Sequence, residues 1–425
     1  MKLESYWLDT APPFESAAQG DVAGHADAVI IGGGFTGLSA ARALARRKAS
    51  VVVLEAGRIV GEASGRNGGQ CNNGLAHDYA ALARRLGSQK ARAFYRAYNA
   101  AVDTVERLVQ EERMDCDFVR RGRLKLAAKP EHYEKLASAC ELLHAEVDPN
   151  VQLVPRDRIR DEVGSDAFYG GLLQTTSAQM HVGKFGVRLA QAAARNGARI
   201  YESAAVSALE RLPSGAFRIR SARGVIEAAQ VLIATGSTSN GPFGWFQRRL
   251  APVGSFIVVT EPLEQAVLDR LLPARRCYVT SKIIGNYFRT TPDNRLLFGG
   301  RARFAMSNPR SDEKSGRILL ATLSEVFPEL SRIRIDYCWG GLVDMTADRL
   351  PRAGEHQGMY YSMGYSGHGV QMSVHMGEVM ADVMDGRPEG NPWRQLDWPT
   401  IPGHFGKPWF LPLVGAYYRA QDILR

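Results

Sequence analysis

The strongest pattern of apolar positions lies close to the start of the chain. Residues 26–34, ADAVIIGGG, contain the apolar run AVII and end in glycines, and this pattern predicts a buried strand. From Thr36 to Arg47 apolar side chains recur at helical spacing, and residues 50–56, SVVVLEA, predict a second buried strand. After a polar, proline-containing lead-in, the chain therefore begins with one βαβ unit.

The periodicity changes further along the chain. Residues 80–113 place apolar side chains on one helical face and predict long amphipathic helices, while residues 181–236 predict a helix followed by short strands. Between residues 253 and 301 the pattern favours antiparallel strands, with a hairpin turn at residues 291–294, TPDN, where proline suits a type I turn. One more helix is predicted over residues 369–385, before an aromatic and proline-rich tail.

Composition and charge exclude several classes of protein. The chain has 425 residues, of which 45% are hydrophobic and 23% charged, enough for two or three domains with cores of their own. No apolar stretch reaches the roughly 18 residues of a membrane helix, and the N-terminus lacks a secretory apolar core, so we expect a cytoplasmic protein. The five cysteines are scattered without ligand spacing and predict neither disulfides nor a metal site. The charge of +9 is spread along the chain, so we expect no nucleic-acid partner.

The glycines after the first strand satisfy the pattern G-x-G-x-x-G at Gly32, Gly34 and Gly37. The first glycine makes the turn, the second lets the backbone approach a pyrophosphate, and the third lets the helix pack on the strand. The helix N-terminus, at Phe35 and Thr36, offers N–H groups and about half a positive charge to the phosphates. In this setting the pattern predicts a dinucleotide site rather than a glycine-rich turn without a ligand.

The end of the second strand supports the same cofactor class. Glu55 stands there, and a carboxylate at this place accepts hydrogen bonds from ribose hydroxyls and disfavours a 2′-phosphate. A nicotinamide-binding domain usually continues into a helix, whereas this chain continues into a glycine-dense polar loop, residues 57–74. Such a loop suggests that the backbone wraps a second large part of the cofactor.

Seven segments in order give the chain a family resemblance. They are VIIGGGFTGLSAA, VVVLEAGRI, GEASGRNGGQ, QVLIATG, YFRTTPDNRLLFGG, WGGLVDMTADRLPRAG and GYSGHGV. With these segments the chain resembles the D-amino-acid-oxidase-like FAD-dependent oxidoreductases over nearly its whole length. That group includes glycine, sarcosine and gamma-glutamylputrescine oxidases, and the chain resembles the last of these most. The resemblance implies FAD as the cofactor.

The same resemblance implies an α/β fold with two domains. A discontinuous Rossmann-like FAD-binding domain would carry an inserted substrate domain of antiparallel sheet and helices, as in glutathione-reductase-like and D-amino-acid-oxidase-like folds. We expect the FAD-binding domain in residues 1–79, 151–250 and 336–425, the last of which includes the C-terminal tail. The substrate domain is expected in residues 80–150, as helices, and in residues 251–335, as an antiparallel sheet.

The resemblance also assigns residues to the cofactor. Those expected beside FAD, in addition to the glycine turn and Glu55, are Ala56, Ser64, Arg66, Asn67, Gly68, Gly69, Gln70, Val206, Thr235, Gly236, Gly340, Gly364, Tyr365, Ser366, Gly367, Gly369 and Val370. Residues 64–70 would cross the flavin, and Val206 would meet the adenine end. Residues 364–370 would bring backbone N–H groups and a helix N-terminus to the pyrimidine side of the ring, which favours the anionic reduced flavin.

Covalent attachment of the flavin is not expected. Sarcosine-oxidase-like relatives link FAD through a cysteine in the segment that aligns near Gly341, whereas Cys338 stands three positions earlier. We therefore expect non-covalent FAD and a buried, inert thiol at Cys338. His181 and His375 are expected to be structural.

The candidate catalytic residues are His368, Tyr287, Arg301 and Trp339. His368 lies in the turn expected at the flavin, and a histidine satisfied by the local backbone is the alternative. Tyr287 is expected as a polar-tipped wall of the pocket or as a tyrosine packed in the sheet, and Trp339 as an apolar wall or as ordinary core. Arg301 and the nearby Arg289 either contact the substrate or serve as surface charges or cofactor contacts.

The resemblance suggests what the active site lacks. Glycine oxidase holds the substrate carboxylate with arginines in the segments that align with WGGLVDMTADRLP and GYSGHGV, where this chain has Val343 and Gly367. Because a guanidinium fork is the usual clamp for a carboxylate, its absence favours an amine over an α-amino acid. The expected substrate is a gamma-glutamylated polyamine such as gamma-glutamylputrescine. Hydride transfer to flavin N5 would give an imine, which hydrolyses to an aldehyde.

Two other functions stay open at this point. One is the oxidation of a secondary or cyclic amino acid such as sarcosine, glycine or pipecolate, and the other is a non-catalytic flavin-binding redox module. Oxygen or an electron carrier would serve as the oxidant. The tail from residue 406 is apolar, aromatic and then basic, so it either docks on its own domain, covers a cofactor tunnel or lies on a membrane surface.

Overall fold

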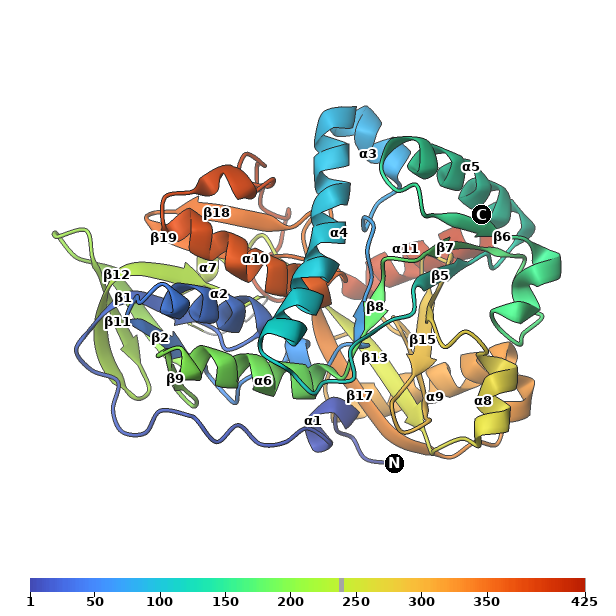
Figure 1. The fold of residues 1–425 in the computed structure, drawn as a ribbon, viewed down its shortest axis with the longest axis horizontal. Helices are drawn as coiled ribbons and strands as arrows, with labels where there is room; N and C mark the ends of the chain where they lie inside the picture. The colour runs from blue at the N-terminus through green and yellow to red at the C-terminus, as the bar shows by residue number, and fades with distance from the viewer. Residues whose placement is uncertain (237–240, 425) are drawn as a thin grey trace.

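The structure is a computed structural model that describes residues 1–236 and 241–424. These residues build two eight-stranded sheets and a small three-stranded sheet. Figure 1 shows the first sheet with its helices on the left and the second sheet on the right, with the long helix α4 (Ser88–Glu111) between them. The expected α/β fold, a parallel sheet joined to an antiparallel one, is confirmed.

The first sheet has a parallel core. Its parallel strands are β1 (His25–Ile31), β2 (Val51–Leu54), β9 (Arg199–Tyr201), β12 (Gly224–Ile233) and β19 (Met359–Met363). β1 lies between β12 and β2, and the register aligns Val29 with Val231 on one side and with Val52 on the other. Covered strands of this kind are built from continuous β-branched runs. Antiparallel strands extend the sheet, namely β10 (Val206–Arg211), β11 (Phe217–Ser221) and β18 (Arg352–His356).

Helices pack on this sheet, and two of them, α2 (Phe35–Arg46) and α10 (Gly369–Met384), begin side by side. The helices are α2, α6 (Val182–Arg195) and α10. A Cβ on Gly377 of α10 would lie 2.5 Å from the Thr36 carbonyl oxygen, so glycine lets α10 approach the backbone of α2. Ser39 of α2 then donates to the Val374 carbonyl oxygen at 2.7 Å. The N-termini of α2 and α10 are thereby held as one unit.

The second sheet is antiparallel except for the pair β14 and β5. Its strands in spatial order are β17 (Ile335–Met345), β13 (Ala251–Thr260), β16 (Leu296–Gly300), β15 (Asn286–Thr290), β14 (Cys277–Thr280), β5 (Arg123–Leu126), β7 (Gly171–Gln174) and β6 (Gln152–Val154). Helix α9 (Pro309–Val326) packs on β13 and β17, where its Leu319 and Leu323 join the core of this sheet.

Shorter elements connect the two large sheets. The remaining helices are α1 (Tyr6–Asp9), α3 (Tyr79–Leu86), α5 (Pro130–Glu146), α7 (Gly244–Gln247), α8 (Gln265–Leu271) and α11 (Leu411–Leu424), together with the short 3-10 helices Ala63–Gly65, Arg156–Asp161, Pro328–Leu330 and Pro388–Gly390. The three-stranded sheet consists of β3 (Gln70–Cys71), β8 (Ala178–Gln179) and β4 (Val119–Arg120).

The structure differs from the sequence-based expectation at the N-terminus. The polar lead-in contains α1, whose Trp7 is fully buried, and Gly183 of α6 lets the Trp7 backbone approach.

The expected domain limits do not follow the sheets at one place. Strands β6 and β7 pair in the second sheet, although the expected limits place residues 151–250 with the dinucleotide-binding segment. The domain limits therefore stay a prediction, and the pairing favours a boundary after β7. No helix of the described residues is both long and apolar enough to cross a membrane.

Candidate functional site

The glycine turn between β1 and α2 forms the first part of the site. Gly32 has a φ of +112°, and a Cβ there would lie 2.5 Å from the Ala234 carbonyl oxygen at the end of β12. A Cβ on Gly37 would overlap the Gly32 carbonyl oxygen, so both positions require glycine. Gly34 is the N-cap of α2 and offers no capping side chain, which leaves the positive end of the helix to an anion.

Glu55 follows β2 and faces this turn. Its Oε2 accepts a hydrogen bond from the Gly33 N–H at 2.7 Å, and its Oε1 accepts one from the Gly57 N–H at 2.8 Å. Burial raises the pKa of this carboxyl group, and the two backbone donors act in the opposite direction. Each carboxylate oxygen keeps a further lone pair, so Glu55 can still accept from a ligand hydroxyl.

Hydrogen bonds hold the polar loop that follows Glu55. Asn67 Nδ2 donates to the Ser64 carbonyl oxygen at 2.8 Å, and Asn67 Oδ1 accepts from the Gly69 N–H at 2.9 Å. Arg66 Nε donates to the Gly340 carbonyl oxygen of β17 at 2.7 Å. The loop is thereby fixed between the start of α2 and strand β17.

Two buried side chains from distant segments support the same loop. The Trp7 indole N–H donates to the Asn67 carbonyl oxygen at 2.7 Å. Arg289 Nη1 donates to the carbonyl oxygens of Gly69, at 2.6 Å, and Met180, at 2.9 Å, and Arg289 is 1% exposed. Arg289 therefore holds the loop from behind, and it is neither a surface charge nor part of the cavity lining.

A second glycine-bearing turn connects β19 with α10. Gly364 and Gly367 have φ angles of +78° and +96°. The Ser366 N–H donates to the Asp344 carbonyl oxygen of β17 at 3.0 Å. Tyr365 Oη lies 2.9 Å from Thr36 Oγ1, which joins this turn to the start of α2. The N-terminus of α10 therefore opens beside the glycine turn.

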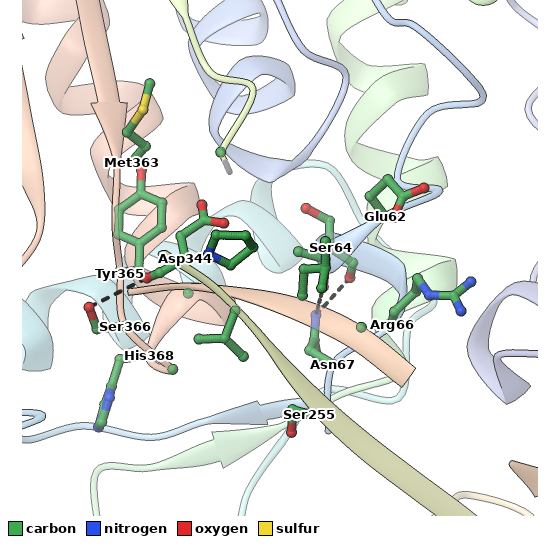
Figure 2. Close-up of a pocket in the computed structure, with 18 of the residues that line it drawn as sticks. Glu62, Ser64, Arg66, Asn67, Ser255, Asp344, Met363, Tyr365, Ser366 and His368 are labelled. Atoms are coloured by element: carbon green, nitrogen blue, oxygen red, sulfur yellow. Dashed lines mark hydrogen bonds between the residues drawn. The ribbon is translucent and has the colours of Figure 1, made fainter. Parts of the chain in front are cut away.

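Both turns line one cavity of about 1940 Å³. Figure 2 shows Ser64, Arg66 and Asn67 on the right of the view and Tyr365 and His368 on the left. The two segments that the sequence assigns to opposite parts of a flavin therefore meet around a single space. Its volume exceeds the roughly 300–1,000 Å³ of an ordinary ligand pocket, so it has room for an extended dinucleotide and a substrate.

Most residues predicted to bind the cofactor line this cavity. They are Gly34, Phe35, Thr36, Glu55, Ala56, Ser64, Arg66, Asn67, Gly68, Gln70, Val206, Thr235, Gly236, Tyr365, Ser366, Gly367, Gly369 and Val370. The other predicted residues lie behind the lining and shape the backbone there, namely Gly32, Gly37, Gly69, Gly340 and Gly364. The contacts of each residue with a cofactor stay predictions.

His368 is the N-cap of α10 and lines the cavity. Burial, with the neighbouring charges of Arg123 and Arg301 as smaller causes, lowers the pKa of its imidazole to about 3, so the ring is neutral at pH 7. Its ring lies edge-on to Tyr98, with ring centroids 5.5 Å apart. Within the described chain, the buried Nδ1 has no hydrogen-bond partner, so the local backbone does not satisfy this nitrogen.

Tyr287 lines the cavity from β15. Its ring contacts two glycines, because a Cβ on Gly68 or on Gly299 would lie 2.7 or 2.5 Å from ring atoms. The hydroxyl lies 3.2 Å from Ser255 Oγ, and burial raises its pKa to about 12. Of the two expected places for Tyr287, the structure therefore has the wall of the cavity, while a catalytic role stays a prediction.

Arg301 lines the cavity just beyond β16. Its Nη2 lies 3.9 Å from the place that a Cβ on Gly367 would occupy, so the guanidinium reaches toward the second turn. Burial lowers the pKa of this guanidinium, and the charge of Arg349 acts in the same direction. Arg301 makes no hydrogen bond or ion pair with the residues that the structure describes.

Trp339 does not line the cavity, which corrects its expected place. The side chain is fully buried, and its indole N–H donates to the Arg66 carbonyl oxygen at 2.9 Å. Gly341, two residues along the same strand, stands against Arg66, since a Cβ there would lie 3.1 Å from Arg66 Cβ. The polar loop thus crosses β17 between Trp339 and the cavity, and Trp339 supports the loop.

Three further expectations concern buried groups away from the cavity. Cys338 is fully buried with its Sγ 3.3 Å from the Asp312 carbonyl oxygen, and burial raises its pKa to about 12. No cysteine of the described residues lines the cavity, while non-covalent attachment of FAD stays a prediction.

His181 Nε2 lies 2.9 Å from Thr10 Oγ1, and His375 Nδ1 lies 2.9 Å from Thr104 Oγ1, so both histidines are structural as expected.

Two basic residues that the sequence reasoning missed line the cavity from β5. Arg123 and Lys125 alternate with Leu124 and Leu126, which are fully buried in the core of the second sheet. The alternation RLKL predicts a strand with one basic face. It does not indicate that this face borders the cavity, because β5 takes its place by pairing with β14, which is distant in the sequence.

The C-terminal segment covers part of the cavity. Trp409 and Arg419 belong to the lining, and α11 packs on the second sheet. Both carboxylate oxygens of Asp422 accept hydrogen bonds, from the N–H groups of Ile283 and Ile284, each at 2.8 Å. The tail therefore docks on its own chain and covers part of the cavity, which are two of the three places that the sequence left open.

The residues around the cavity fit a dinucleotide cofactor. The turn at Gly32 and Gly37 leaves no room for side chains, and Glu55 offers a carboxylate at the strand end. Thr235 Oγ1, at the end of β12, is buried without a hydrogen-bond partner among the described residues. The positive ends of α2 and α10 open on the same space. A parallel sheet with this turn, joined to an antiparallel sheet that closes the cavity, defines the class of the flavoprotein oxidoreductases.

Comparison with known proteins places the chain within that class. A family model described as "FAD dependent oxidoreductase" matches residues 27–383, and the chain belongs to this family, whose cofactor is FAD. Over 404 residues the chain is 31% identical to gamma-glutamylputrescine oxidoreductase of Escherichia coli. This alignment covers 94% of this chain and 93% of that protein. Over 382 residues it is 25% identical to glycine oxidase of Bacillus licheniformis, and this alignment covers 86% of this chain and 95% of that protein. The expected resemblance and cofactor are confirmed.

Solved structures share the fold. Glycine oxidase of Geobacillus kaustophilus superposes with a TM-score of 0.71 at 21% identity, covering 90% of this chain and 98% of that chain. L-proline dehydrogenase of P. horikoshii superposes with a TM-score of 0.71 at 18% identity, covering 87% of this chain and 96% of that chain.

Proposed function

We propose that this FAD-dependent oxidoreductase oxidises the C–N bond of an amine, and that the amine is a gamma-glutamylated polyamine such as gamma-glutamylputrescine. The similarity to gamma-glutamylputrescine oxidoreductase of Escherichia coli, over 94% of this chain, supports the substrate class. When bound, FAD supplies the hydride acceptor, and the imine product hydrolyses to an aldehyde and ammonia. The other tasks, which are orientation, desolvation and proton placement, fall to the side chains around the cavity.

The observation that carries the proposal is the wall formed by Val343 and Gly367. Both residues line the cavity, and neither has a polar side chain that could hold a carboxylate. Glycine oxidase is expected to have arginines in the segments that align with them. A bidentate guanidinium would fix a carboxylate on the carbon that reacts, so a bare wall favours a substrate whose reacting carbon carries none.

The cavity also favours the reactive form of an amine. An ammonium group has no free lone pair to assist loss of a hydride from its carbon, so the substrate nitrogen must lose its proton. Burial beside Tyr287 and the neutral His368, with the cation Arg301 in the same space, disfavours a charged ammonium and lowers its pKa. The start of α10 offers N–H groups and a positive helix end to an anion beside it.

A second candidate substrate is a secondary or cyclic amino acid. The specific observation in its favour is Arg301, which lines the cavity, reaches toward Gly367 and makes no ion pair with the described residues. A carboxylate bound there would stand close to the second turn, as an α-amino acid requires.

Anaerobic mixing of the yellow holoenzyme with four compounds tests the proposal. We expect gamma-glutamylputrescine to bleach the flavin absorbance at least tenfold faster than putrescine, sarcosine or pipecolate, and to yield an aldehyde that a hydrazine reagent traps. Fastest bleaching by sarcosine or pipecolate would overturn the proposal in favour of the amino-acid candidate. A colour that persists with every amine and amino acid would instead indicate a non-catalytic flavin-binding module.

A further inference from the structure

Strand β5 presents two cations to the cavity. Arg123 and Lys125 lie on one face of the strand, with the buried Leu124 and Leu126 on the other. Lys125 is opposite Val279 on β14, and Val279 is opposite Tyr287 on β15. Two strand spacings therefore separate the Lys125 and Tyr287 backbones, about 10 Å across the same sheet face. Arg123 and Lys125 therefore line the same cavity as Tyr287, two strands closer to the β6 edge of the sheet.

These half-buried cations form no ion pair with a carboxylate of the described residues. Lys125 and Arg301 make no hydrogen bond or ion pair within the described residues. Arg123 donates from Nη2 to Gln174 Oε1, whereas its Nε is buried and has no partner there. All three side chains are half-buried and line the cavity, and this partial burial lowers the pKa of each group. A partly desolvated cation without a counter-ion costs free energy that a bound anion would recover in part.

A chain of hydrogen bonds holds Arg123 in place without neutralising it. Gln174, which accepts from Arg123, donates from Nε2 to Tyr95 Oη at 2.8 Å, and Tyr95 Oη donates to Asp148 Oδ2 at 2.8 Å. The carboxylate of Asp148 thus stands two side chains away from the guanidinium. The remaining N–H groups of Arg123 are oriented while the charge stays available.

Unpartnered polar atoms gather around the same place. Within the described chain, Asn72 Oδ1, Tyr98 Oη and His368 Nδ1 are buried and have no hydrogen-bond partner. The Tyr98 and His368 rings are in contact, and His368 senses the charges of Arg123, Lys125 and Arg301. Asn72 and His368 line the cavity, and the fully buried Tyr98 lies behind the lining. Buried polar atoms are almost always satisfied in native proteins, so this group of atoms fits a polar ligand or ordered water.

We propose that Arg123, Lys125 and Arg301 form a carboxylate-binding recess at the substrate end of the cavity, and that the enzyme therefore selects amines that carry a carboxylate over bare polyamines. The inference rests on the proposed function and specifies how that substrate is recognised. A guanidinium binds a carboxylate through two parallel hydrogen bonds, and an ammonium adds a point charge. A diamine such as putrescine would bring two positive charges to three cations that form no ion pair with the described residues, and the repulsion would weaken its binding.

Binding of glutarate to the FAD-loaded enzyme tests the recess directly. Glutarate carries carboxylates but no amine, so calorimetry measures recognition without turnover. The holoenzyme is used because bound FAD is expected to occupy the start of α2, which could otherwise bind the anion. We expect glutarate to bind the wild-type holoenzyme and putrescine to bind at least tenfold more weakly. We expect Lys125→Met and Arg123→Gln each to weaken glutarate binding at least tenfold, with Lys125→Arg retaining it.

The control is Lys90→Met, which removes one positive charge from an exposed position on α4. Glutarate binding in this variant is expected to stay within threefold of wild type. FAD content and far-UV circular dichroism establish that each variant is folded. Equal glutarate affinity in wild type and Lys125→Met, or putrescine binding as tight as glutarate, would overturn the inference.

Steady-state kinetics separate this inference from the proposed function. If the recess exists, Lys125→Met raises KM for gamma-glutamylputrescine at least tenfold and leaves kcat within threefold. Gamma-glutamylputrescine that reduces the flavin with an unchanged KM in Lys125→Met would refute the recess and leave the function standing. Lys125-dependent glutarate binding without flavin reduction by gamma-glutamylputrescine would refute the function and leave the recess standing.

Discussion

Replacement of Glu55 by alanine should weaken FAD binding about a hundredfold and leave the apoprotein folded. In the structure the Glu55 carboxylate accepts hydrogen bonds from Gly33 at 2.7 Å and from Gly57 at 2.8 Å. A hydrogen bond to a charged group contributes about 1.5–3 kcal/mol, but Glu55 is only half-buried, so water replaces part of each bond. We expect the free energy of unfolding of the apoprotein to fall by about 1–3 kcal/mol.

FAD binding weakens because Glu55→Ala also removes the expected acceptor of the ribose hydroxyls. Loss of about 3 kcal/mol of charge-assisted hydrogen bonding corresponds to a dissociation constant for FAD that rises roughly a hundredfold. Equilibrium dialysis of FAD against the apoprotein measures the constant, and urea unfolding measures the stability.

Glu62→Ala is the matched control for this experiment. Glu62 lines the same cavity and carries the same charge, but it is exposed and holds neither Gly33 nor Gly57. We expect its FAD dissociation constant to stay within threefold of wild type. A folded Glu55→Ala variant that binds FAD as tightly as wild type, or a Glu62→Ala variant that loses as much affinity, would refute the assignment of Glu55 to the ribose.

Three further substitutions test the supports of the site. Burial lowers the pKa of His181 to about 4, so on acidification the unfolded chain binds a proton before the folded chain does. This group should lower the free energy of unfolding by about 2 kcal/mol between pH 7 and pH 5. His181→Asn should remove that part of the pH dependence, as measured by urea unfolding at each pH, and an unchanged pH dependence would contradict this role. Arg289→Met removes the donor to the Gly69 carbonyl oxygen and should raise the FAD dissociation constant about tenfold in equilibrium dialysis, where an unchanged value would contradict the role of Arg289. Asp422→Asn weakens the bonds to the N–H groups of Ile283 and Ile284 and should speed limited proteolysis of α11 several-fold with FAD retained, whereas equal cleavage rates would show that this contact does not hold the tail.

The elements that local periodicity defines could be predicted from the sequence. The βαβ unit over β1, α2 and β2 follows from continuous apolar runs around a helical pattern, and the glycine turn follows from steric needs that a few residues set. The hairpin of β15 and β16 has the turn at residues 291–294 that its proline indicates, with the Thr291 N–H donating to the Arg295 carbonyl oxygen at 2.9 Å.

Contacts between distant segments could not be predicted in the same way. Trp339 stands on the strand face that alternation assigns to the cavity, but the loop that carries Arg66 crosses that face and covers it. Arg123 and Lys125 enter the cavity because β5 pairs with β14, a register that no local pattern specifies. Helix α1 is only four residues long, so it has no periodicity that would reveal the burial of Trp7.

Strand β17 joins the two halves of the molecule through its own carbonyl groups. It pairs with β13 along the second sheet, while its Gly340 carbonyl oxygen holds Arg66 and its Asp344 carbonyl oxygen holds the Ser366 turn. A change that reshapes β17 would therefore act on both loops that are expected to face the flavin. We therefore expect substitutions in β17 that alter the choice of substrate to alter the reduction potential of the bound FAD as well.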